Sequence, residues 1–163
     1  MALPAYFKSV ERARMAEADT LLGSIAQAQQ RRWMKVGNYS KLFSGLDVSP
    51  TSAAQPTFCT KGDYTPSTPG QGGAATPASC AGNGFAITLD QTNFKDLANG
   101  TVTAERVNNS QYTYTLSRPY QSTVVTCEIG TSEEDKAICA EYCGIDSLTG
   151  NSCTTADAAA AGN

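Results

Sequence analysis

The first part of the chain constrains the fold most, because it favours a single helix of unusual length. Between Phe7 and Val36 only Gly23 interrupts a run of residues that a helix tolerates well. At about 1.5 Å per residue, a helix over residues 1–37 is roughly 50 Å long. No Ser, Thr, Asp or Asn precedes it as an N-cap. A helix this long in a small domain must project from it or pack against something outside it.

The long helix carries two different apolar patterns. In its second part, apolar residues recur mostly at three- and four-residue spacings, which suits a helix that covers a sheet. These residues are Met15, Ala18, Leu22, Ile25, Trp33 and Val36. Before Met15 the apolar residues are larger and lie on a different arc, and they are Leu3, Tyr6, Phe7 and Val10. Gly37 and Asn38 supply a left-handed stop, which ends the predicted helix.

Composition limits the classes of function. The 163 residues suit one domain, and a net charge of −3 argues weakly against a protein that coats nucleic acid. The chain has no His, so it lacks the commonest general base and the commonest metal ligand. We therefore predict no catalytic residue, no cofactor and no enzymatic activity. We also expect no nucleic-acid partner, because a solvated charged face explains the basic residues of the helix, which are Arg12, Arg14, Arg31, Arg32 and Lys35.

The rest of the chain predicts an α+β domain. Strand-forming residues at period two, separated by turn residues, indicate an antiparallel sheet of three or four strands over 84–127, at about 84–89, 101–107, 111–116 and 123–127. The stripe of the long helix would cover one face of this sheet. The other segments are a variable connecting loop over 38–83, a cysteine-bounded region with a short helix over 127–153, and a flexible tail over 154–163.

A short second helix is predicted in the cysteine-bounded region. Ser132 is placed as its N-cap, acidic residues follow in the first turn, and Gly144 ends it after Tyr142. The acidic residues are Glu133, Glu134 and Asp135. A calcium site is the alternative use of these acids, but their interaction with the helix dipole is the favoured interpretation.

Six cysteines, all outside the long helix, indicate disulfides and an oxidising compartment. They are Cys59, Cys80, Cys127, Cys139, Cys143 and Cys153. A Cys59–Cys80 bridge would close a loop of about 20 residues and contribute roughly 3 kcal/mol. The alternative is a zinc site formed by the last four cysteines. Structural zinc sites usually have paired short knuckles, and only Cys139 and Cys143 are spaced in that way, so disulfides are favoured over a metal.

Four short segments of the helix and its end resemble a known family. They are Ala2-Leu3-Pro4-Ala5-Tyr6, Glu11-Arg12-Ala13, Ala16-Glu17-Ala18 and Gly37-Asn38-Tyr39. They are similar to the N-terminal helix of type IV pilins and their pseudopilin relatives, as is the order of segments along the chain. The family's cleavage site and apolar N-terminal segment are absent here. The resemblance therefore implies a soluble fragment that lacks the hydrophobic part of the helix.

The resemblance implies a structural subunit of a type IV pilus that serves adhesion, twitching motility or uptake. Its partners would be other copies of itself, related pilins, the inner-membrane assembly machinery and an unidentified surface or host target. The protein would be anchored in the inner membrane before assembly and extracellular in the filament. Four residues would continue the face that is buried in the filament, namely Leu3, Tyr6, Phe7 and Val10. The alternatives are a pseudopilin of a type II secretion system, whose major form usually has a calcium-bound C-terminal loop, and less favourably a DNA-binding uptake pilin.

The resemblance also bears on the disulfides. In this family two cysteines usually bound the C-terminal loop, which places Cys127 opposite one of three later cysteines. We pair Cys127 with Cys139 and Cys143 with Cys153. Because Cys139 and Cys143 lie on one helix face, the swapped pairing of 127–143 and 139–153 is nearly as easy.

Overall fold

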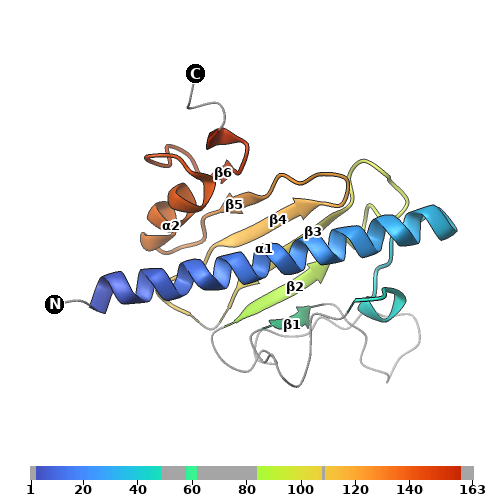
Figure 1. Cartoon of the computed structure of the whole chain (residues 1–163), viewed down its shortest axis with the longest axis horizontal. Coiled ribbons are helices and arrows are strands. Elements are labelled where there is room, and N and C mark those ends of the chain that lie inside the picture. The colour runs from blue at the N-terminus through green and yellow to red at the C-terminus, as the bar shows by residue number, and fades with distance from the viewer. Residues whose placement is uncertain (1–2, 49–57, 62–83, 108, 159–163) are drawn as a thin grey trace.

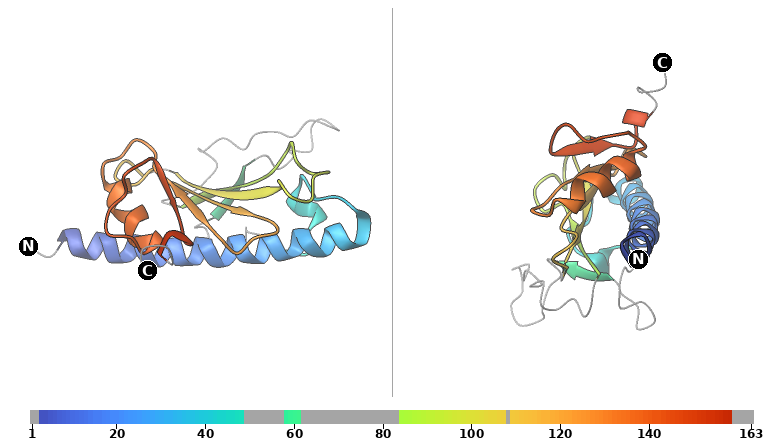
Figure 2. Two further views of the ribbon diagram at one scale, coloured as in Figure 1. Left: turned by 90° about the horizontal axis from the view of Figure 1, so that it is seen from above. Right: turned by 90° about the vertical axis from the view of Figure 1, so that its left-hand side faces the viewer.

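The computed structural model describes residues 3–48, 58–61, 84–107 and 109–158, and it has the α+β architecture that the sequence predicts. A long helix runs along one face of a sheet, and a second, short helix lies near its N-terminal end (Figures 1 and 2). The elements are α1 (Leu3–Val36), η1 (Phe43–Gly45), β1 (Phe58–Lys61), β2 (Phe85–Leu89), β3 (Thr101–Arg106), β4 (Thr115–Pro119), β5 (Thr126–Glu128), α2 (Glu134–Cys143) and β6 (Ser152–Thr154).

Within the described residues the sheet has six strands in the order of the chain, more than the three or four predicted. Strands β2 to β6 are antiparallel neighbours, whereas β1 pairs with β2 in parallel. The additional strands, β1 and β6, fall in the predicted connecting loop and the cysteine-bounded region. They are only four and three residues long, too short for a period-two pattern to be recognised. The strand predicted at 111–116 begins later, at Thr115.

The apolar stripe of α1 forms the core with the inner face of the sheet. Met15, Ala18, Leu22 and Ile25 are fully buried and pack with residues of β2, β3 and β4. The stripe ends sooner than predicted, because Val36 lies in the last turn and is 55% exposed. In the described part of the chain, no helix is both long and apolar enough to cross a membrane.

The chain turns back after α1 through a left-handed glycine, as predicted. Gly37 has a φ of 69° and follows Val36 directly. The side chain of the buried Gln29 then holds the loop that follows: its Nε2 donates to the Ser40 carbonyl at 2.8 Å, and its Oε1 accepts from the Ser40 N–H at 2.7 Å. Beyond this turn, the rings of Tyr39 and Tyr120 meet edge to face with their centroids 4.5 Å apart.

The C-terminal region is closed by two disulfides, Cys127–Cys139 and Cys143–Cys153, which is the pairing chosen above over the swapped one. Each joins α2 to a strand, β5 or β6. Gly144 ends α2 in the left-handed conformation, as predicted. The predicted Cys59–Cys80 pair lies outside the described residues, since Cys80 is not among them.

Two details of the C-terminal region differ from prediction. The N-cap of α2 is Glu133, without a side-chain cap, rather than Ser132. Instead, the Ser132 hydroxyl donates to the Glu134 carboxylate at 2.7 Å and accepts from the Glu134 N–H at 3.3 Å. The described part of the predicted flexible tail, residues 154–158, is held against the sheet, because the Thr155 N–H donates to the Val125 carbonyl at 2.9 Å. Residues 159–163 lie outside the described part.

Candidate functional site

The first turns of α1 form the candidate site, because they extend beyond the strands (Figure 1). Glu11 is the first buried residue of the helix among those whose side chains are described. Before it, Tyr6 is 64% and Phe7 48% exposed, and Val10 is half-buried. The Tyr6 and Phe7 rings meet edge to face with centroids 5.8 Å apart. We call Tyr6, Phe7 and Val10 the N-terminal face; the side chain of Leu3, which was predicted to belong to it, is outside the described part.

A depression of about 340 Å³ lies beside the N-terminal face. Its other wall comes from the turn before β4, where Asn109, Gln111 and Tyr112 line it. The Asn109 side-chain oxygen accepts from the backbone N–H groups of Gln111 and Tyr112, at 2.8 and 3.0 Å, which fixes this turn. The predicted interface residues thus meet a second segment almost a hundred positions away, which no local pattern in the sequence indicated.

A buried ion pair fixes α1 to the sheet one turn after Phe7. Arg106 of β3 donates from Nε to Glu11 Oε1 at 2.6 Å and from Nη2 to Oε2 at 3.2 Å. The Tyr114 hydroxyl donates to the same Oε1 at 2.7 Å. Burial, together with the Glu11 carboxylate, raises the pKa of Tyr114 well above its usual value, so the phenol remains a donor. Both charges are satisfied at a depth where an unpaired charge would be costly.

The sequence contained a signal for the buried Glu11–Arg106 pair that the prediction missed. Glu11 lies four residues before Met15, and Gln29 lies four residues after Ile25, so both continue the apolar stripe. Each is buried, with 2% and 0% of its surface exposed. A polar residue at a stripe position of a helix is therefore expected to have a buried partner on the sheet.

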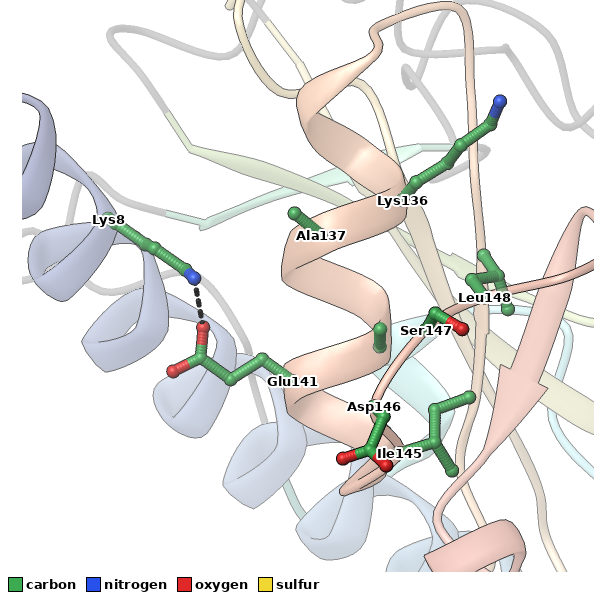
Figure 3. A pocket seen from close by; sticks show the side chains of 9 residues that line it. Lys8, Lys136, Ala137, Glu141, Ile145, Asp146, Ser147 and Leu148 are labelled. Atoms are coloured by element: carbon green, nitrogen blue, oxygen red, sulfur yellow. Dashed lines mark ion pairs between the residues drawn. The ribbon is translucent and has the colours of Figure 1, made fainter.

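The positive charges of the first turns are bound within the domain. The Lys8 side chain points toward the Glu141 carboxylate of α2 (Figure 3). Lys8 Nζ lies 2.7 Å from Glu141 Oε2, and Arg12 Nη1 lies 2.8 Å from Oε1. The hydrogen bond from Lys8 lowers the pKa of Glu141 below its usual value. A groove of about 570 Å³ is lined by Lys8, by residues of α2 that include Glu141, and by the loop after α2. These cations therefore face α2, whereas Tyr6 and Phe7 border the depression beside the turn before β4 and keep 64% and 48% of their surface exposed.

The acids considered for calcium do not converge. The Glu133 side chain is 89% exposed, while Asp135 is fully buried and accepts hydrogen bonds from Thr113 and from the Gly130 N–H. With the cysteines oxidised, the described residues contain no group of three or more His, Cys, Asp or Glu side chains arranged to hold a metal ion.

The basic residues near the end of α1 are likewise engaged within the domain. Arg31 forms a two-point pair with Asp47 at 2.9 and 2.6 Å, and Arg32 donates to the Gly45 carbonyl at 3.2 Å. These contacts agree with a solvated, self-paired helix face.

Comparisons of the chain with protein-family models, with curated proteins and with solved structures find no match. The function is therefore argued from the short N-terminal motifs and from the geometry of the helix end.

Proposed function

We propose that this chain is a structural subunit of a type IV pilus, joined to other copies of itself and to related pilins through the N-terminal face. One observation carries the proposal: Tyr6 and Phe7 remain exposed at the end of a helix that buries its apolar stripe completely from Met15 to Ile25. Fully burying an aromatic side chain contributes about 1.5–3 kcal/mol. Aromatic residues exposed together therefore favour a surface that another molecule covers.

The architecture supports the same proposal. A long N-terminal helix on an antiparallel sheet, with disulfides in the C-terminal region, is compatible with a pilin-like fold. The disulfide-closed C-terminal region favours a pilin over a secretion pseudopilin, whose major form usually binds calcium there. A melting temperature that rises with added calcium would reverse this preference.

The proposal places the protein in the inner membrane before assembly and outside the cell afterwards. The filament would serve adhesion, twitching motility or uptake. The assembly machinery would be a partner before polymerisation, and a surface or host target a partner afterwards. The N-terminal face would meet neighbouring subunits.

The test is the presence of the full-length protein in surface filaments of the cells that produce it. Filaments are sheared from cells that express the wild type, Phe7→Glu or Leu97→Glu, and an antibody against this domain detects the subunit. Leu97 is a matched control, since it is 47% exposed, compared with 48% for Phe7, and lies far from the N-terminal face on the loop between β2 and β3. We expect the wild type and L97E in the filament fraction, and F7E only in the cell envelope.

Purified F7E and L97E domains should melt at the same temperature, which separates loss of assembly from loss of folding. Wild-type protein absent from sheared filaments would overturn the proposed function. Assembly of F7E at the wild-type level would overturn the role of the N-terminal face.

A further inference from the structure

The four cysteines of the C-terminal region form a closed ring in the folded chain. The Cα atoms of Cys127 and Cys139 are 5.6 Å apart, and those of Cys143 and Cys153 are 6.1 Å apart. Cys127 and Cys153 are direct partners in the β5–β6 ladder, where facing Cα atoms lie about 4.5–5.5 Å apart. Cys139 and Cys143 are one turn apart on α2, which places their Cβ atoms about 5–6 Å apart. All four sides of the ring are therefore of similar length.

The four cysteines lie together in the interior of the domain. The four cysteines are 0–4% exposed. The Cys153 sulfur lies 3.2 Å from the Cys139 carbonyl oxygen, so the sulfur of one disulfide rests against the backbone that carries the other. Two strands and one helix thus direct four sulfur atoms into the same buried space.

Such a ring has the dimensions of a structural zinc site. Zinc binds four cysteine sulfurs at about 2.3 Å, so neighbouring sulfurs of the tetrahedron are about 3.8 Å apart. Cα atoms about 5–6 Å apart can supply sulfurs at that separation. The sequence argued against zinc because it has only one short cysteine knuckle. In the fold, the pairing of Cys127 with Cys153 takes the place of the second knuckle.

We propose that these four cysteines form a tetrathiolate zinc site when the chain is reduced. The C-terminal region then has two closed states, one with two disulfides and one with a single Zn²⁺. The two disulfides take four electrons and four protons from two dithiol molecules, which become disulfides themselves. Zn²⁺ then displaces one proton from each of the four thiols. This inference is independent of the proposed filament role.

The test uses the chain after reduction with dithiothreitol, which is removed under nitrogen because a dithiol competes for the metal. Cobalt(II) is added as a spectroscopic probe. We expect one equivalent to bind, with thiolate-to-cobalt charge transfer and the d–d bands of tetrahedral cobalt, and Zn²⁺ to displace it. The Cys59→Ser, Cys80→Ser double variant should behave like the wild type, because it keeps all four cysteines of the ring.

Adding both Cys127→Ser and Cys153→Ser to that background leaves only two thiolates and should abolish the tetrathiolate cobalt spectrum. Absence of the spectrum in the Cys59→Ser, Cys80→Ser variant, or an unchanged spectrum after the two further substitutions, would overturn the proposal. Thermal melting followed by circular dichroism gives a second readout. Zinc should raise the melting temperature of the reduced double variant and leave that of the oxidised form unchanged. A reduced chain that stays unfolded with zinc present would also contradict the site.

Discussion

The buried ion pair between Glu11 and Arg106 gives the sharpest prediction about stability. In Glu11→Gln the side chain keeps its shape but loses its charge, so the Arg106 guanidinium stays buried without a counter-charge. The Arg106 side chain has 0% of its surface exposed, and its remaining acceptors are two backbone carbonyls, those of Gly84 and Val107. Removing one member of a buried pair costs about 3–5 kcal/mol. The amide oxygen of Gln can still accept a hydrogen bond, so we expect the lower end, about 3 kcal/mol.

The assay is urea unfolding at pH 7 with the disulfides intact. With an m-value of about 2 kcal/mol/M, a loss of about 3 kcal/mol lowers the midpoint by about 1.5 M. The matched control is Glu133→Gln, the same change at an exposed acid 3.8 Å from Lys136. The control should alter the free energy of unfolding by no more than about 0.5 kcal/mol.

A double variant separates the charge from the packing. Glu11→Met leaves Arg106 unpaired, whereas Glu11→Met combined with Arg106→Met removes both charges and fills the space with apolar atoms. We expect the double variant to be more stable than E11M alone, because no uncompensated charge remains. A midpoint of E11Q within experimental error of that of E133Q would refute the reasoning. So would a double variant that is no more stable than E11M alone.

Three further predictions concern packing and pH. Gly100→Ala would place a Cβ 2.6–2.7 Å from the rings of two buried tyrosines and should cost about 1–3 kcal/mol, whereas Gly150→Ala, with nothing within 4 Å, should leave the melting temperature unchanged. The lowered pKa of Glu141 means that its pair with Lys8 stabilises the fold above the usual carboxyl pKa of about 4.3 and that this stability is lost as pH falls through the lower folded value. Wild type should therefore have a higher melting temperature than Glu141→Gln at pH 7, a difference that corresponds to less than about 1 kcal/mol in the free energy of unfolding. The two melting temperatures should converge in acid. Because the pKa of Tyr114 is raised, stability should fall as pH rises above about 10, and part of the tyrosinate absorbance should appear only together with the loss of helical circular dichroism.

Where the sequence encodes structure locally, the prediction agreed with the fold. The helix predicted over residues 1–37 is described over Leu3–Val36, and Gly37 and Gly144 end their helices with the positive φ that glycine permits. The stripe from Met15 to Ile25 is buried because its spacing matches the turn of a helix. These features depend on neighbours within a few residues, which a sequence pattern records.

Features that depend on distant partners were missed. Strand β1 pairs with β2 in parallel, and the sequence of its four residues does not indicate this pairing. The turn at 109–112 lines the candidate site only because the sheet brings it beside Val10. Asp135 was predicted to serve the first turn of its own helix, but its carboxylate accepts from Thr113 and Gly130. Tertiary hydrogen bonds replaced a local cap there, and no spacing rule indicates such a replacement.

The position of α1 along the sheet decides whether the N-terminal face is exposed. An apolar stripe with three- and four-residue spacings repeats, so a slide of one turn, about 5.4 Å, would still place apolar residues on the sheet. Such a slide would bring Met15, or a residue near Phe7, opposite Arg106 and leave its guanidinium buried without a carboxylate. The cost of an unpaired buried charge therefore selects one register, the one in which Glu11 meets Arg106. The exposure of Tyr6 and Phe7 thus follows from the placement of one ion pair, not from the length of the helix.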